Sequence, residues 1–436
     1  MQCELRPLKD LCSLIADCPH STPVWTDSGH VVIRNQNIKG GRLDLSSPSF
    51  TDALHFAHRI RRAKPLAGDI IFTREAPMGE VCMIPSGLEC CVGQRQVLLR
   101  PNPDVVNGRF LLFALQSPQV QHEIGWNEGT GSTVSNVRIP VLEALRIPTP
   151  SLETQNAIAA ALGVLDDRID LLRQTNATLE SIAQAIFKSW FIDFDPVRAK
   201  AEGREPEGMD VATAALFPAE FEESALGLIP KGWRVTRVTD AIEFNPSRSL
   251  PKGAEARYLE MANAPTSGHR PLAHVEKRAF GSGCKFRNGD ALLAKITPCL
   301  ENGKSAYVDF LDDAEIGWGS TEFIVLRAKS VLPQYGAYLL ARHEPFRQFA
   351  IQAMTGTSGR QRVELSRLAQ FPLALPQDSA IANAAELTLR ALQSRIAAND
   401  EQAKTLAGLR DGLLPRLISG KLRLPEPQEP LEEATA

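Results

Sequence analysis

The residue combinations in this sequence that could support catalysis or metal binding are incomplete. Gly303-Lys304-Ser305 ends like a phosphate-binding loop, but Pro298 stands where such a loop has a glycine, so the cradle of backbone N–H groups is missing. Cys12, Cys18 and His20 offer three possible zinc ligands, but their spacing lacks the tight ligand pairs of structural zinc. We therefore expect no metal site and no catalytic residues.

Two more patterns have a structural explanation. Asn245-Pro246-Ser247-Arg248 resembles part of the Asn-Pro-Pro-aromatic motif that holds a flipped base in amino-methyltransferases, but the second proline and the aromatic residue are absent. Asp193 and Asp195 form an acidic pair, but they flank Phe194 in a stretch that we expect to end a helix. These observations favour recognition over catalysis.

An internal repeat of about 225 residues organises the chain. Residues 68–74 (GDIIFTR) correspond to residues 289–295 (GDALLAK), and residues 130–133 correspond to residues 355–358. Short β-type runs and helical patches predict an α+β fold for each globular half. We call residues 1–150 the first lobe and residues 232–376 the second lobe.

A long helical pattern follows each lobe. Apolar residues alternate in steps of four and three in both patterns, which is the seam of a coiled coil. The seam positions are Ile158, Leu162, Leu165, Ile169, Leu172, Asn176, Leu179, Ala183 and Ile186 in the first helix, and Ala385, Leu389, Leu392, Ile396, Asn399, Ala403 and Leu406 in the second. Asn176 and Asn399 either fix the register of the seam or lie at its edge.

These helices are predicted over residues 151–197 and 377–421, packed as an antiparallel coiled coil that gives the chain a pseudo-twofold repeat. Residues 151–191 would form a helix of about 60 Å. Residues 198–231 are predicted to be an extended linker, and the acidic, proline-rich residues 422–436 a disordered tail.

The net charge of the chain conceals differences between its segments. The 436 residues contain 48 Lys and Arg against 51 Asp and Glu, a net charge of −3. By segment, the first lobe carries +1, residues 151–231 carry −7, the second lobe carries +5 and residues 377–436 carry −2. The lobes are thus the basic parts, which permits nucleic-acid binding. Without an apolar leader or a long apolar run, we expect a cytoplasmic protein.

Four stretches resemble the specificity subunit of type I restriction–modification enzymes. They are PxxxxQxxIA at residues 150–159, FKSWFIDFDPV at 187–197, GLIPKGW at 227–233 and LLPRLISG at 413–420. With the repeat, the resemblance covers nearly the whole chain. It implies two target recognition domains, each reading one half of a bipartite site in double-stranded DNA. The helices would set the spacing and dock methyltransferase subunits, of which we expect two.

The resemblance also implies motor–nuclease subunits, and it assigns S-adenosylmethionine, ATP and Mg²⁺ to the partner subunits. Because base edges carry sequence information and phosphates carry register, the candidate DNA-binding residues are polar loop residues. In the first lobe they are Arg34, Asn35, Gln36, Asn37, Arg74, Gln94, Arg95, Thr130, Ser132 and Thr133. In the second lobe they are Asn263, Lys295, Thr355, Thr357, Ser358, Arg360, Gln361 and Arg362.

Two alternatives remain open from the residues alone. The chain could be a single-chain DNA methyltransferase or nuclease whose site is not recognisable in the sequence, although the cofactor loops are missing. It could also be a coiled-coil adaptor that binds only proteins. Salt-dependent DNA binding would count against the adaptor, because phosphate contacts release counterions.

Overall fold

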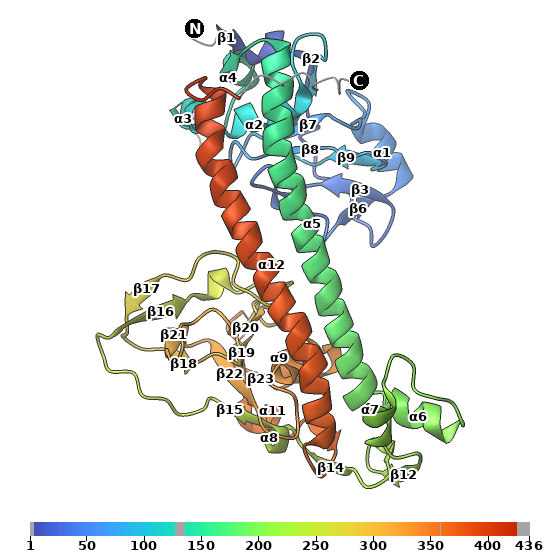
Figure 1. The fold of residues 1–436 in the computed structure, drawn as a ribbon. Coiled ribbons are helices and arrows are strands. Elements are labelled where there is room, and N and C mark those ends of the chain that lie inside the picture. Colours follow the sequence, from blue (N-terminus) through green and yellow to red (C-terminus); the bar gives the residue numbers. More distant parts are fainter. Residues whose placement is uncertain (1–3, 127–135, 358, 425–436) are drawn as a thin grey trace, which may run out of the picture. The chain divides into compact units, whose positions relative to one another are not determined.

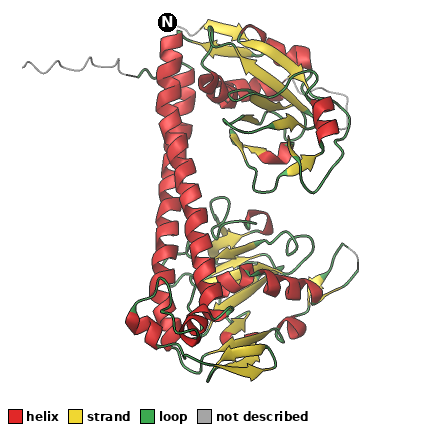
Figure 2. Ribbon diagram, turned by 90° about the vertical axis from the view of Figure 1, so that its right-hand side faces the viewer, coloured by secondary structure: helices red, strands yellow, loops and turns green. Residues whose placement is uncertain are grey.

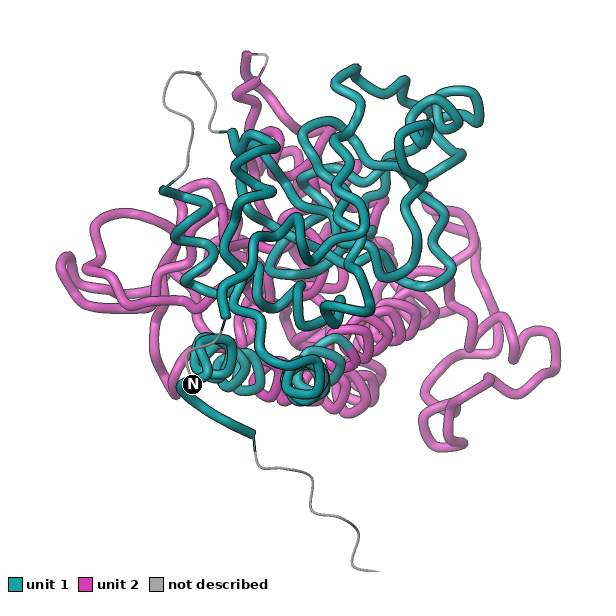
Figure 3. Tube along the Cα trace, turned by 90° about the horizontal axis from the view of Figure 1, so that it is seen from above, with its two compact units in different colours: residues 1–170, 404–436 teal, residues 171–403 magenta. Residues whose placement is uncertain are grey.

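The chain folds into two compact units in the computed structural model, which describes residues 4–126, 136–357 and 359–424. Unit 1 comprises residues 1–170 with 404–436, and unit 2 comprises residues 171–403 (Figure 3). Each unit holds one lobe of mixed helices and strands together with segments of two long helices (Figures 1 and 2). The long helices are α5 (Leu152–Phe191) and α12 (Ala380–Ile418).

An antiparallel sheet of order β2-β10-β7-β8 forms the centre of the first lobe. Its strands are β2 (Cys12–Asp17), β10 (Gln96–Pro101), β7 (Ile70–Thr73) and β8 (Val81–Met83). Helix α2 (Gly108–Gln116) contributes a buried run, Phe110 to Leu115, to the core beside this sheet. Asn107 caps this helix by accepting a hydrogen bond from the backbone N–H of Phe110 at 3.0 Å.

Smaller elements complete the first lobe. Strand β3 (His30–Ile33) lies between β6 (Ser49–Thr51) and β9 (Cys90–Val92), and β1 (Glu4–Pro7) pairs with β11 (Arg146–Thr149). The others are η1 (Leu8–Asp10), η2 (Asn35–Asn37), β4 (Ile38–Lys39), β5 (Arg42–Leu43), α1 (Ala53–Arg59), α3 (Pro118–Trp126) and α4 (Ile139–Ala144).

The second lobe repeats this topology, which confirms the predicted α+β repeat. Its central sheet has the order β15-β22-β19-β20, from β15 (Ile242–Phe244), β22 (Phe323–Ala328), β19 (Asp290–Ala294) and β20 (Ser305–Tyr307). A second sheet has the order β17-β16-β21-β18, from β17 (Lys277–Ala279), β16 (Glu255–Leu259), β21 (Gly317–Gly319) and β18 (Cys284–Phe286). Strand β14 (Arg234–Arg237) pairs with β25 (Pro372–Leu375), as β1 does with β11.

The other elements of the second lobe are short. They are α8 (Val238–Ala241), η3 (Met261–Asn263), α9 (Gly336–Arg342), α10 (Glu344–Gln352), β23 (Met354–Thr355), β24 (Arg362–Val363) and α11 (Leu365–Leu368).

The repeated Gly-Asp pair has the same structural role in both lobes. Gly68 and Gly289 have φ values of 86° and 89°, a conformation that favours glycine. The following carboxylate, Asp69 or Asp290, pairs with an arginine on the neighbouring strand. That partner is Arg100 on β10 in the first lobe and Arg327 on β22 in the second. The acidic turn is therefore part of the lobe's framework.

The two long helices pack against each other in antiparallel order, as predicted. In unit 1, Ile158 and Leu162 of α5 share a core with Leu414 and Leu417 of α12. In unit 2, Ala183 of α5 shares a core with Ala385 and Leu389 of α12. The predicted seam positions are all buried or half-buried.

The helix ends differ from the predicted limits. Helix α5 ends at Phe191, because Phe194 adopts a left-handed conformation (φ 59°) before α6 (Asp195–Ala201) begins. Helix α12 spans Ala380–Ile418, so it begins three residues after and ends three residues before the predicted limits of 377 and 421.

The predicted extended linker, residues 198–231, also differs from the structure. It contains the end of α6, helix α7 (Val211–Ala215) and the hairpin of β12 (Phe221–Ser224) with β13 (Gly227–Pro230). The stretch folds because Phe217 and Ile229 reach the core of the second lobe, a long-range contact that local composition does not reveal. Residues 425–436 of the predicted tail lie outside the described residues. Among the helices that the structure describes, none has the length and apolar character required to span a membrane.

Candidate nucleic-acid interface

The exposed candidates of the first lobe lie around helix η2. Arg34 is exposed, and its guanidinium lies 4.9 Å from the centroid of the Trp25 ring. Gln36 is exposed, and Asn35 is half-buried and accepts a hydrogen bond from Gln96 at 3.2 Å. Arg34 and Gln36 are therefore the members of this segment whose side chains reach solvent.

Asn37 has a structural role instead. It is 3% exposed, its Oδ1 accepts from the backbone N–H of Arg34 at 3.0 Å, and its Nδ2 donates to the carbonyl of Asp44 at 2.9 Å. Asn263 occupies the corresponding place in the second lobe and closes its loop through two bonds to the backbone of Ala273. Both asparagines therefore stabilise loop conformations through side-chain to backbone hydrogen bonds.

Arg74, Gln94 and Arg95 are also engaged within the first lobe. Arg74 is nearly buried, with its guanidinium 2.9 Å from the carboxylate of Asp17. Gln94 donates to the carbonyl of His20 at 2.6 Å. Arg95 is exposed and pairs with Glu75 at 2.9 Å. Its charge is thus partly compensated, but its guanidinium remains accessible to solvent. Thr130, Ser132 and Thr133 lie outside the described residues.

The hairpin of β23 and β24 carries the second lobe's exposed candidates. Thr355, Thr357, Arg360 and Arg362 are exposed and Gln361 is half-buried, while Ser358 lies outside the described residues. Arg362 pairs with Glu322 at 2.8 Å, and this hydrogen-bonded pair holds the pKa of the Glu322 carboxyl below its usual range. Arg360 forms no ion pair with the part of the chain that the structure describes.

Lys295 lines a cleft of about 410 Å³ in the second lobe. The cleft is also lined by Asn245, Ser247, Arg248, Lys285 and Thr321. Lys285 was not among the candidates predicted from the sequence, and residues 245–248 were predicted only as a possible base-binding motif. The sequence shows that Arg248, Lys285 and Lys295 are basic, but it does not show that they line the same cleft.

No group of three His, Cys, Asp or Glu residues within the described ranges is placed to hold a metal ion. Cys12 is half-buried, and burial raises the pKa of its thiol to about 12, while His20 contacts Asp17.

Comparison with known proteins gives the family. Residues 5–181 match the family model described as the type I restriction modification DNA specificity domain. The MjaIX specificity subunit of Methanocaldococcus jannaschii is 26% identical over 370 residues, which cover 82% of this chain and 78% of that protein. The HindI specificity subunit of Haemophilus influenzae is 36% identical over 214 residues, 40% of this chain and 47% of that protein. These matches support the assignment of the chain as a type I restriction–modification specificity subunit.

The fold agrees with that assignment. The solved type I S subunit from M. genitalium superposes with a TM-score of 0.50 at 16% identity, covering 95% of each chain. Neither the single-chain enzyme nor the protein-only adaptor is supported by these matches.

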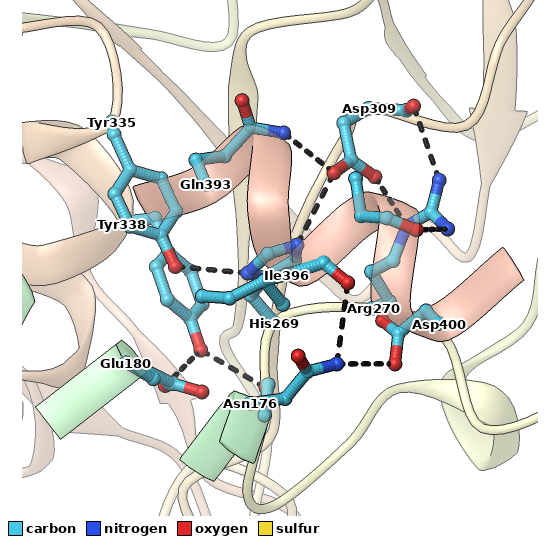
Figure 4. A network of polar contacts seen from close by, with 12 residues as sticks. Asn176, Glu180, His269, Arg270, Asp309, Tyr335, Tyr338, Gln393, Ile396 and Asp400 are labelled. Carbon is cyan, nitrogen blue, oxygen red and sulfur yellow. Dashed lines mark hydrogen bonds and ion pairs between the residues drawn. The ribbon is translucent and has the colours of Figure 1, made fainter. Parts of the chain in front are cut away.

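A buried polar network joins the second lobe of this specificity subunit to both long helices (Figure 4). Tyr338 donates to Glu180 of α5 at 2.6 Å, while Asp309 accepts from Gln393 of α12 at 2.7 Å. Arg270 reaches Asp309 at 2.8 Å and Glu401 of α12 at 2.6 Å. Glu401 is exposed, and the other groups are hydrogen-bonded, so their burial is compensated and they fix the lobe on the helix pair within unit 2.

His269 lies at the centre of this network. It is 1% exposed, and its Nε2 lies 3.2 Å from Asp309 and its Nδ1 2.9 Å from the hydroxyl of Tyr335. Because a carboxylate only accepts, Nε2 carries a proton toward Asp309. Burial raises the pKa of the Asp309 carboxyl, but the hydrogen bonds from His269 and Arg270 outweigh it, so this pKa lies below its ordinary value.

The first lobe of this specificity subunit is attached differently within unit 1. Arg42 contacts Asp166 of α5 at 3.3 Å and Asp170 at 2.9 Å, and Arg410 of α12 contacts Asp166 at 2.6 Å. Asp166 therefore links the lobe and the two helices through one carboxylate.

Proposed function

We propose that each lobe of this specificity subunit reads one half of a bipartite site in double-stranded DNA. The observation that carries the proposal is the repeated lobe, whose two copies share one strand order but differ in loop chemistry. Helix η2 presents Asn35 and Gln36, whereas the corresponding helix η3 has Met261 and Ala262. Two copies of one scaffold with different exposed side chains are suited to two different half-sites.

In this role the chain itself would carry out no catalytic step. Methyl transfer and cleavage belong to methyltransferase and motor–nuclease subunits, together with S-adenosylmethionine, ATP and Mg²⁺. Two methyltransferase subunits would dock on the helices, which also set the distance between the half-sites.

An exposed face of α5 supports docking of a partner helix. Val164, Leu171 and Ile182 are 68%, 52% and 43% exposed. Their spacings of seven and eleven residues return to the same side of a helix with about 100° per residue. Apolar side chains at such spacing resemble a second helix seam, outside the seam that α12 covers.

Methylome sequencing tests the reading role. The chain is expressed with its methyltransferase partner in cells that lack other methylation of this type, and the same partner without the chain is the control. We expect a new methylated motif of two short specified segments separated by unspecified bases, present only with the chain. A contiguous motif, or no new methylation, would contradict the proposal.

Co-purification tests the docking face. Leu171→Glu places a charge in the middle of the exposed apolar face and should abolish recovery of the methyltransferase with the chain. Ala177→Glu is the matched control, because Ala177 is exposed on another side of α5. Equal recovery with both variants would contradict docking at this face.

A further inference from the structure

The lining of the cleft in the second lobe contains basic residues and no acidic residue. Among its lining residues, Arg248 is paired with the buried Asp290 at 2.6 Å, and none of the lining residues is acidic. Lys285 donates to the carbonyl of Arg248 at 3.1 Å, which fixes its position without removing its charge. Lys295 has no ion-pair partner within the described residues. Two ammonium groups therefore line one cleft.

The residue that corresponds to Lys295 in the first lobe, Arg74, does have an acidic partner. The backbone N–H of Arg74 donates to Arg95 and that of Lys295 donates to Glu322, both at 2.9 Å, at corresponding places in the two sheets. Arg74 is neutralised by Asp17, the second residue after Ile15 of β2. In the second lobe Phe244 takes the place of Ile15, so Pro246 stands where the acidic residue would be. The second lobe thus has the basic residue but no acidic residue at the position of its partner.

The acidic groups near the cleft are already engaged. Glu322 pairs with Arg362, and Asp290 pairs with both Arg248 and Arg327. Burial raises the pKa of the Cys284 thiol to about 12, so this part of the wall stays neutral. An anion entering the cleft would meet two ammonium groups and the hydroxyls of Ser247 and Thr321, with no unpaired carboxylate on the lining.

We propose that this cleft binds a phosphodiester of the DNA backbone, with Lys285 and Lys295 as its charged contacts. The proposal rests on the proposed function and deepens it. Phosphate contacts fix the register of a protein on the duplex and carry no sequence information directly. Lys285 and Lys295 would thus position the second lobe, while base reading belongs to other side chains, such as those on the β23–β24 hairpin.

The salt dependence of DNA binding tests the cleft. A fluorescent duplex of randomised sequence is titrated with the full chain between 50 and 200 mM salt, using K285Q, K295Q and the double variant. Each phosphate contact contributes about 0.9 to the slope of log K against log salt. We expect each single variant to lower the slope by about this amount and the double variant by about twice as much, with several-fold weaker binding at low salt.

Lys329→Gln is the matched control. Lys329 follows β22 at the end opposite to Phe323, which lines the cleft, and it donates to the carbonyl of Thr239 at 2.6 Å. We expect its slope to equal that of the unsubstituted chain. If the control lowers the slope as much as the cleft variants, or if the cleft variants leave it unchanged, the cleft proposal is wrong. If the unsubstituted chain shows no salt-dependent binding, the proposed function itself fails.

Lysine acetylation provides a readout that needs no variant. The full chain is acetylated with and without the randomised duplex, and modified lysines are quantified by mass spectrometry. DNA should protect Lys285 and Lys295 and leave Lys329 unprotected. Loss of protection at the two cleft lysines, with other lysines of the lobes still protected, would overturn the cleft proposal while leaving DNA binding intact.

Discussion

Asn399 donates a hydrogen bond from its Nδ2 to the Oδ1 of Asn176 at 2.8 Å, so the polar residues of the two helix seams meet each other. Asn176 in turn donates to the carbonyl of Ile396 at 3.2 Å and to Asp400 at 2.8 Å. The two asparagines are 9% and 2% exposed, so they lie inside the seam. A shift of either helix would leave both amides buried without this pairing, which favours a single register.

Replacement of one asparagine should cost more than replacement of both. Asn176→Leu leaves the amide of Asn399 buried without its acceptor, and we expect a loss of about 1–3 kcal/mol in the free energy of unfolding. In Asn176→Leu/Asn399→Leu both polar groups are gone, and the double variant should be more stable than either single variant. Urea unfolding of the four proteins gives the coupling energy. Strictly additive losses would show that the pair does not interact.

The Asp309 network predicts a pH-dependent contribution to stability. The pKa of the Asp309 carboxyl is below its ordinary value of 3.8 in the folded chain, so its stabilisation is present above that pH and is lost as the pH falls through the folded value. Asp309→Asn should therefore cost about 3 kcal/mol at pH 7, and the difference from the unsubstituted chain should shrink below about pH 4. Urea unfolding across this pH range measures it.

The control for this prediction is Asp313→Asn in the same lobe. Asp313 is exposed, so its substitution should change the free energy of unfolding little at any of these pH values. A cost for Asp309→Asn that does not depend on pH would contradict the assignment of a depressed pKa.

Periodicity explains why the helices and the repeat could be predicted. The four–three alternation from Ile158 to Ile186 depends only on local spacing, and the structure buries or half-buries these positions. The pairing of Asn176 with Asn399 was not predictable to the same degree. A seam shows which face of a helix is covered, but it does not show which residue of the second helix lies opposite.

The exposure and the internal ion pairs of the candidate DNA-binding residues could not be predicted from the sequence. Arg74 and Arg34 are the same residue type after a short strand, yet Arg74 is paired with Asp17 and Arg34 is exposed. The difference depends on a partner 57 residues away along the chain. Exposure and internal pairing are tertiary properties, so residue type and loop position could only nominate candidates.

Substitutions at neighbouring residues of helix η2 should therefore affect different properties, stability in one case and base preference in the other. Asn37→Ala removes a buried side chain that bonds to Arg34 and Asp44, and it should lower the free energy of unfolding by about 1–3 kcal/mol. Gln36→Ala removes an exposed side chain and should leave stability unchanged while relaxing base preference in the first half-site. Thermal melting and methylome sequencing distinguish the two effects. A stable Asn37→Ala variant with altered base preference would contradict the structural role of Asn37.

Arg360→Ala should weaken recognition of the second half-site alone. Arg360 is exposed on the β23–β24 hairpin and is not neutralised by a described carboxylate, so its guanidinium is available for a bidentate contact with a base. Loss of such a contact costs about 1–3 kcal/mol and affects one base position, whereas loss of a phosphate contact weakens binding to all sequences. Binding is measured on duplexes in which each half-site is mutated in turn, with Arg34→Ala as the reciprocal variant in the first lobe. Because the lobes are separate copies, each variant should leave the opposite half-site preference intact, and equal loss at both half-sites would show that the lobes do not read independently.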